Sequence, residues 1–398
     1  MKDRYLPLLA TVTVFVLVFA VGAVNFNHFL TWNNVGSMLT DNAFIIIAAI
    51  GETFVIISGG IDLSVGSMIG FVGVVMAHLD VMGWHPLASG AMLIAFGIAF
   101  GAFQGIVIDF CEIQPFIITL AGLFLLRGAC FLVSLESVPV KHPFVGDFAD
   151  WHFDLGGGGD LSTLAIVMLV VFAAGVVFGY LTRLGANVDA KGGDLPSAKL
   201  MGVPIRSPTI MIYARAVFYS VLGGLAYGLC TLGPSGGRLS SSAMVMLVVL
   251  VAGILIAHFT RFGTNVYAIG GDLASAKLMG VPIRRTTVKI YALAGFYNAL
   301  GGVVYALYTG SGYPLAGLGD ELIAIAAVVL GGTLLTGGVG LVFGTLFGGL
   351  IQGLITTLVN FQGTLTSWWA TIFVGVLLFV FIVAQRTIMT SFMARRAI

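Results

Sequence analysis

The segment LPLLATVTVFVLVFAVGAV, from Leu6 to Val24, carries no charged residue and is long enough to cross a lipid bilayer as one helix. It follows a basic start, as the apolar core of a secretory signal peptide does. The apolar run is too long for such a core, and no cleavage site of small residues follows it. We therefore predict that this segment is a first membrane-spanning helix.

Apolar runs of the same kind recur from one end of the chain to the other. Of the 398 residues, 59% are hydrophobic and 9% are charged, whereas about a quarter of the residues in soluble domains are charged. The net charge of +1 provides no basic face for a nucleic acid. The composition predicts one all-α, polytopic membrane domain over residues 1–398.

Sliding windows of about 20 apolar residues can be placed roughly twelve times. Their starts lie near Leu6, Met38, Leu63, Pro86, Pro115, Ser162, Pro208, Ser241, Val288, Leu322, Val339 and Ser367. Lys and Arg gather in cytoplasmic loops, and with the amino terminus inside only Lys141 and Arg238 remain in outside loops. Both termini are therefore predicted to be cytoplasmic.

The predicted spans include an internal repeat. SAKLMGVPIR, from Ser197 to Arg206, recurs letter for letter from Ser275 to Arg284, 78 positions later. The repeat units cover residues 162–229 and 240–307. Each unit holds an inward span, a basic loop and an outward span, so a tandem duplication adds two crossings and preserves the orientation of everything downstream.

The segment IISGGIDLSVGS, from Ile56 to Ser67, predicts an interrupted helix. Glycine admits the backbone angles of a sharp break, and Asp62 or Ser64 could cap the next helix. Unwound backbone at membrane depth occurs only where it is buried in protein or lines a wet cavity. A role in a transport pathway and an ordinary interfacial turn both remain open.

Catalytic and nucleotide-binding patterns are missing from the sequence. The loops at Gly192 and Gly270 lack the spacing of a phosphate-binding loop, and the six histidines have no regular carboxylate or cysteine neighbours. Three cysteines at irregular spacing suggest neither a disulfide framework nor a metal site. We expect no enzyme activity, no metal and no cofactor bound by this chain, so that any ATP is hydrolysed by a separate chain.

Several segments together resemble the ribose and xylose type of ABC sugar permease, within the larger family of branched-chain amino acid permeases. These segments are IISGGIDLSVGS, IQPFIITLAGLFLLRG at 113–128, TRFGTNVYAIGGDLASAKLMGVPIR at 260–284 and ELIAIAAVVLGGTLLTGGVGLVFGTLFGGLIQGLI at 321–355. LTDNAF at 39–44 and GTLTSWW at 363–369 resemble galactofuranose importer permeases in particular. The resemblance covers the whole chain except the extra repeat copy.

This resemblance implies a permease of the bacterial inner membrane that moves a monosaccharide by alternating access. Its partners would be two cytoplasmic ATPase subunits, a second permease chain, identical or different, and a periplasmic sugar-binding protein. Family members have roughly ten spans, so the duplication accounts for the two extra ones. An ATP-independent secondary transporter and a non-transporting scaffold left by the duplication remain as alternatives.

The basic loop of the second repeat copy resembles the segment that couples such permeases to the ATPase. A lipid-facing basic loop is the simpler alternative, but it would not explain the glycine pair followed by aspartate. Only one copy needs to couple, and the second leads directly into the family-like segment after Gly310. The predicted coupling residues are Arg261, Gly270, Gly271, Asp272, Ser275, Lys277, Gly280 and Arg284.

Polar or family-like positions within the spans are candidates for the substrate pathway. The candidates are Asn42, Glu52, Gly59, Gly60, Asp62, Ser64, Phe116, Thr119 and Glu321. An intramembrane carboxyl group such as Glu52 is a functional hypothesis by default, although a buried hydrogen bond or a peculiarity of this lineage would also explain it. The glycines four residues apart, among them Gly97, Gly101 and Gly105, instead predict close helix packing.

Overall fold

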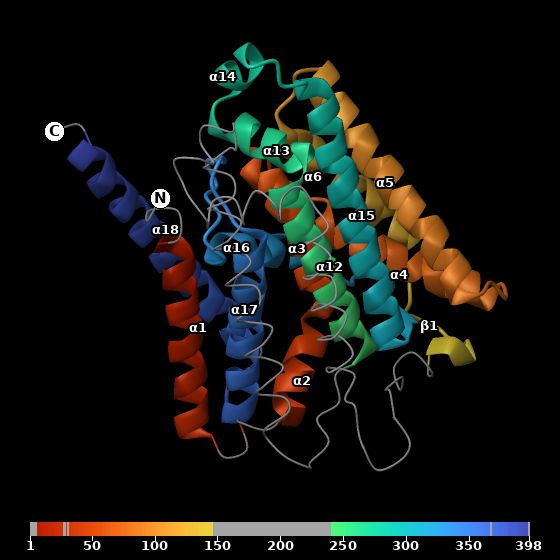
Figure 1. Ribbon diagram of the computed structural model, residues 1–398. Coiled ribbons are helices and arrows are strands. Elements are labelled where there is room, and N and C mark those ends of the chain that lie inside the picture. Colours follow the sequence, from red (N-terminus) through yellow and green to blue (C-terminus); the bar gives the residue numbers. More distant parts are fainter. Residues whose placement is uncertain (1–5, 27–28, 30–31, 146–239, 367, 397–398) are drawn as a thin grey trace, which may run out of the picture. The chain divides into compact units, whose positions relative to one another are not determined.

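The computed structural model describes residues 6–26, 29, 32–145, 240–366 and 368–396 (Figure 1). Helices dominate this part of the chain, as the apolar composition predicts. They are α1 (Leu6–Asn25), α2 (Trp32–Asp41), α3 (Ala43–Ile57), α4 (Val65–Val81), α5 (Pro86–Phe110), α6 (Pro115–Val133), α12 (Ser241–Phe259), α13 (Arg261–Gly271), α14 (Leu273–Leu278), α15 (Ile283–Thr309), α16 (Asp320–Leu330), α17 (Val342–Gln362) and α18 (Trp368–Arg396).

The only strands within the described residues are two short ones. β1 (Val138–Pro139) and β2 (Ser311–Gly312) pair in an antiparallel manner, with Val138 opposite Gly312. They lie at the end of the helices opposite α13 and α14, and we call these two ends the β end and the α14 end. In Figure 1, the start of α1 and the last turns of α18 both lie toward the α14 end.

Six of the described helices are long and apolar enough to cross a membrane. They are residues Leu8–Asn25 of α1 together with α5, α6, α12, α15 and α17, and shorter apolar helices cover Ala43–Ile57, Val65–Val81 and Trp368–Val383. The protein is therefore a multi-pass helical membrane protein. The predicted spans near Ser162 and Pro208, and the whole first repeat unit, lie outside the described residues.

Two of the predicted spans differ from the structure. The window near Met38 is divided into α2 and α3, with Asn42 between them. The window near Leu322 contains α16, whose 11 residues cover roughly 16 Å and cannot cross a bilayer alone. Hydropathy responds to apolar length and does not detect where a helix stops, so both windows look continuous in the sequence.

The core is built around α3. Every residue of α3 except Phe44 is buried, and α15, α16, α12 and α17 pack around it. A helix that is apolar on all sides is expected to be enclosed, either by other helices or by lipid. Here it is enclosed by protein.

Glycines let neighbouring helices approach closely, as their spacing predicts. A Cβ atom on Gly97 would lie 2.5 Å from the Gly295 carbonyl oxygen, and one on Gly101 would overlap the Tyr291 carbonyl oxygen. The same α5 face continues at Gly105, where a Cβ would lie 2.8 Å from the Val288 Cα atom. Small residues at this spacing are the usual means of close helix contact in lipid.

Candidate functional site

The break between α3 and α4 is the first feature of the candidate site. α3 ends at Ile57, Gly59 has a φ of +86°, and α4 begins at Val65. A positive φ costs a residue with a side chain more than it costs glycine, which explains Gly59 at this turn. The predicted helix interruption is therefore confirmed.

Ser64 occupies the N-cap position of α4, but its side chain does not cap the helix. Its hydroxyl and its backbone N–H both donate to Asp62 Oδ1, at 2.6 and 2.8 Å. The expectation that Asp62 or Ser64 caps α4 is therefore wrong. The Ser64 side chain is instead turned toward the Asp62 carboxyl group.

A buried polar cluster forms where the chain turns back along α3. The backbone N–H of Asp62 donates to Glu52 Oε1 at 3.1 Å, and Asn298 Nδ2 on α15 donates to Asp62 Oδ2 at 3.2 Å. Gln104 Nε2 on α5 donates to the Ser64 hydroxyl at 3.4 Å. All five side chains are at most 5% exposed, so the break is held by interactions inside the chain.

Three atoms of this cluster remain without hydrogen-bond partners among the described residues. They are Glu52 Oε2, Asn298 Oδ1 and the Tyr291 hydroxyl. The Tyr291 hydroxyl lies against Gly60, where a Cβ atom would approach it to 2.5 Å. Unpaired buried polar atoms are rare in native cores because leaving them unpaired costs free energy.

The two candidate residues on α6 have different positions. The Thr119 hydroxyl lies within hydrogen-bonding distance of the Ile61 carbonyl oxygen, at 3.1 Å, and of the Pro115 carbonyl oxygen of its own helix, at 3.0 Å. It therefore brings α6 into contact with the broken segment. Phe116, one turn earlier, is 48% exposed and makes no polar contact with the cluster. The structure thus joins Thr119, but not Phe116, to the break.

Asn42 lies away from the other candidates. It stands at the N-cap position of α3, and its side-chain amide donates to the Met38 carbonyl oxygen at 2.7 Å. A Cβ atom on Gly353 of α17 would overlap this amide. Asn42 therefore marks the contact of the α2–α3 turn with α17.

A second set of polar residues lies where α4, α6 and the segment between β2 and α16 meet. Arg127 Nη1 donates to the carbonyl oxygens of Pro314 and Ala316, at 2.7 Å each. Glu321 Oε2 is buried without a hydrogen-bond partner among the described residues, beside Gly66. Glu321 therefore lies against α4, but among the contacts described it joins no hydrogen bond of the Glu52–Asp62 cluster.

Sequence reasoning missed four contributors, Gln104, Arg127, Tyr291 and Asn298. Polar side chains inside spans are rare and form a usable signal, and applying it to amides and hydroxyls as well as to carboxyl groups would have found them.

The predicted coupling loop forms two short helices at the α14 end. The Thr260 hydroxyl accepts from the Gly263 N–H at 3.1 Å and starts α13. Asp272 starts α14, where its Oδ1 accepts from the Ser275 N–H at 2.6 Å. This hydrogen bond lowers the pKa of the Asp272 carboxyl group below its usual value.

Most residues of α14 are exposed. Leu273, Leu278 and Met279 are 55%, 89% and 69% exposed, and only Ala276 of α14 is buried. Arg261, Lys277 and Gly280 are also exposed, and Gly280 ends the turn after α14 with a φ of +75°.

Arg284 is less free than the sequence suggests. Its Nε atom lies 3.3 Å from Asp109 Oδ2 at the end of α5, although the side chain remains 79% exposed. The pair attaches the start of α15 to α5. Lys277 and Arg285 are also exposed cations near α14.

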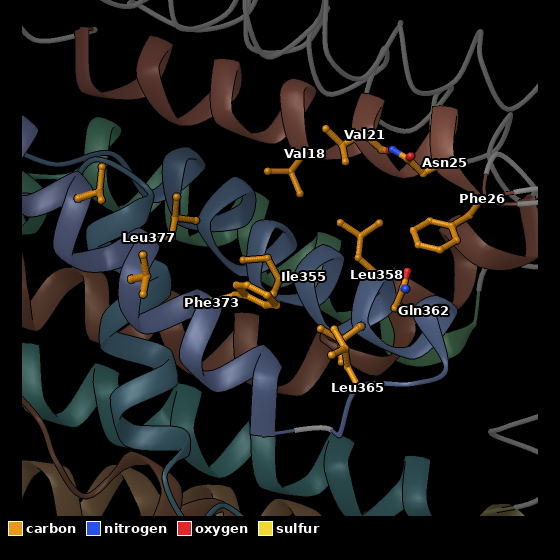
Figure 2. Close-up of a pocket in the computed structure, with 13 residues that line it drawn as sticks. Val18, Val21, Asn25, Phe26, Ile355, Leu358, Gln362, Leu365, Phe373 and Leu377 are labelled. Atoms are coloured by element: carbon orange, nitrogen blue, oxygen red, sulfur yellow. The ribbon is translucent and has the colours of Figure 1, made fainter.

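An open groove between α1, α17 and α18 has a volume of about 710 Å³ (Figure 2). Val18 on α1 and Ile355 and Leu358 on α17 extend into it, and its only polar lining residues are Asn25 and Gln362. None of the predicted pathway residues lines it. A sugar requires several converging polar groups, so this apolar groove does not suit one.

Taken together, a multi-pass helical core, a buried helix break and an exposed helix pair at one end define a membrane transport component. A family model described as branched-chain amino acid transport system / permease component matches residues 34–242 and 233–382. The chain belongs to this family, and within it is an ABC sugar permease of the ribose and xylose type, a transport subunit rather than an enzyme.

Individual relatives agree with this assignment. The chain is 42% identical over 387 residues to the inner membrane ABC transporter permease protein YjfF of Escherichia coli (strain K12), covering 97% of this chain and 93% of the relative. It is 32% identical over 327 residues to the xylose transport system permease protein XylH of Haemophilus influenzae, covering 80% of each chain. It is 29% identical over 386 residues to the fructose import permease protein FruG of Bifidobacterium longum, covering 97% of this chain and 92% of the relative. No solved structure matches the chain.

Proposed function

We propose that this chain forms the sugar pathway of an ATP-driven importer in the bacterial inner membrane. Two ATPase subunits bind its α14 end in the cytoplasm, a second permease chain completes the pathway, and a periplasmic binding protein delivers the sugar. Both termini are cytoplasmic. The cargo is galactofuranose or a similar monosaccharide, on the resemblance of residues 39–44 and 363–369 to galactofuranose permeases.

The observation that carries this proposal is the exposed apolar surface of α14. Leu278 and Met279 lie outside the membrane-spanning helices and yet are 89% and 69% exposed. Apolar side chains grouped in water mark a docking surface for another protein. Lys277 and Arg285 beside them supply positive charge for an acidic partner surface.

Transport assays in vesicles test the proposal. The chain is reconstituted with its ATPase, its second permease chain and its binding protein, and uptake of labelled galactofuranose is measured with and without ATP. We expect uptake only with ATP. Uptake driven by an ion gradient without the ATPase would identify a secondary transporter, and the absence of any uptake would leave a non-transporting scaffold.

A variant of the docking surface separates assembly from transport. Leu278→Asp places a charge on the apolar surface, and we expect it to abolish binding of the ATPase subunit without changing the thermal unfolding midpoint. Glu112→Gln, an exposed position at the same end of the helices, serves as the control. Normal ATPase binding by Leu278→Asp would refute this docking surface.

A further inference from the structure

Three chain segments meet backbone to backbone at the α14 end of α3. The Ile57 carbonyl oxygen accepts a hydrogen bond of 2.8 Å from the Gly338 N–H, in the loop between α16 and α17. Gly270, near the end of α13, lies against the same carbonyl oxygen. We call Ile57, Gly270, Gly337 and Gly338 the glycine joint.

Only glycine fits at these contacts. A Cβ atom on Gly270 would overlap the Ile57 carbonyl oxygen and would lie 2.6 Å from the Gly338 nitrogen. Gly337 and Gly338 have φ values of +83° and +74°, and a Cβ on Gly338 would lie 2.8 Å from the Gly271 Cα atom. The segments therefore touch through backbone atoms, with no flexible side chain between them.

Other contacts hold α13 firmly on the membrane helices. Val266 is fully buried and Ile269 is 9% exposed. The Tyr267 hydroxyl donates to the Gly340 carbonyl oxygen at 2.8 Å, in the same loop as Gly338. By contrast, Ala276 is the only buried residue of α14.

α14 is therefore attached to the membrane helices through α13. The glycine joint lies at the end of α3 and in the loop between α16 and α17, so it contacts the connections of three apolar helices at once. The helix break begins directly after Ile57, and the chain then continues to Asp62. Close-packed backbone transmits a displacement because it has no side-chain rotamers that could absorb it.

We propose that the glycine joint is the element through which ATPase movements at α14 reach α3, α16 and α17. This inference rests on the proposed function, since it assigns a coupling role to residues of an ATP-driven importer. Gly270 acts here as a positioning residue. It keeps α13 in direct backbone contact with Ile57.

The test compares two glycines in the assembled importer. Gly270→Ala introduces a methyl group into the joint, whereas Gly375→Ala on α18 introduces one into open space, with no atom within 4 Å. ATP hydrolysis and sugar uptake are measured in the same proteoliposomes, together with retention of the ATPase subunit. We expect Gly270→Ala to retain the ATPase but to lower the sugar transported per ATP at least about fivefold, and Gly375→Ala to match the wild type.

If Gly270→Ala transports as much sugar per ATP as the wild type, the coupling role of the glycine joint is refuted. The proposed importer function is not affected by that result. If Gly270→Ala does not assemble, Tyr267→Phe decides, because it removes the hydrogen bond from the Tyr267 hydroxyl to the Gly340 carbonyl oxygen without adding an atom to the joint. A two- to fivefold lower ratio in Tyr267→Phe supports the joint, and an unchanged ratio refutes it. A wild-type protein without ATP-driven uptake would instead refute the proposed function.

Discussion

Asp62 and Glu52 are joined by a hydrogen bond inside the core, in which the backbone N–H of Asp62 donates to Glu52 Oε1 at 3.1 Å. The carboxyl group in the middle of α3 thus holds the chain that follows the helix break. Both side chains are at most 1% exposed. Glu52 therefore has a structural task whether or not it also contributes to the pathway.

Two substitutions of Glu52 should distinguish the contribution of its hydrogen bond to stability from that of its charge. Glu52→Gln keeps an acceptor oxygen for the Asp62 N–H, so we expect an unfolding midpoint equal to or above that of the wild type. Glu52→Leu leaves this N–H unpaired in the core, which costs about 1–3 kcal/mol. Thermal unfolding of the purified protein measures both, with the exposed Glu136→Gln as control. Equal stability of the Gln and Leu variants would show that the hydrogen bond is unimportant.

The sequence predicted the membrane class and the interruption after α3, because each depends on local pattern. Apolar length and two adjacent glycines are visible within a few residues. Asn298 could not be placed in the cluster in this way, because it lies 236 positions from Asp62 and meets it only through the packing of α15 on α3. The shortness of α16 was missed because the glycine-rich turn that follows it is as apolar as the helix.

Asn298 should therefore be as important for stability as the residues that the sequence singled out. Its amide donates to Asp62 Oδ2 at 3.2 Å, and hydrogen bonds to carboxylates contribute about 1.5–3 kcal/mol. We expect Asn298→Ala to lower the unfolding free energy by about this amount. Asn25→Ala, at an exposed position, is the matched control. A double variant with Asp62→Ala should lose less than the sum of the single losses, and strict additivity would contradict a direct bond.

Arg127 should be needed for the order of the segment that precedes α16. Its guanidinium group bridges the Pro314 and Ala316 carbonyl oxygens, at 2.7 Å each. We expect Arg127→Met to leave both carbonyl groups without this donor, to speed proteolysis of the 311–319 segment and to reduce uptake. Arg127→Lys keeps one donor and should have an intermediate effect. If the 311–319 segment of Arg127→Met is cleaved at the wild-type rate, the Arg127 hydrogen bonds are not needed to order this segment.

Gly66 should tolerate no side chain, because α4 meets the 311–319 segment there. A Cβ atom on Gly66 would overlap the Gly317 carbonyl oxygen and approach Glu321 Oε2. We expect Gly66→Ala to destabilise the fold by about 1–3 kcal/mol, the usual cost of overpacking. Gly128→Ala on α6 has no atom within 4 Å of the new methyl group and should be neutral or stabilising. Equal unfolding midpoints for the two variants would contradict the close contact.

The start of α14 should be insensitive to pH over the physiological range. The hydrogen bond from the Ser275 N–H lowers the pKa of Asp272 from the usual value of 3.8, so the ionised form is favoured in the folded loop. The stabilisation is then complete above the unfolded value and is lost only as the pH falls through the lower folded value. We expect ATPase binding by the wild type to be constant between about pH 6 and 8 in this respect, and to weaken several-fold in Asp272→Ala. Asp272→Asn keeps a capping oxygen, so we expect it to bind the ATPase as the wild type does at pH 7. If Asp272→Asn loses as much ATPase binding as Asp272→Ala, the charge of Asp272 matters rather than its role as a cap.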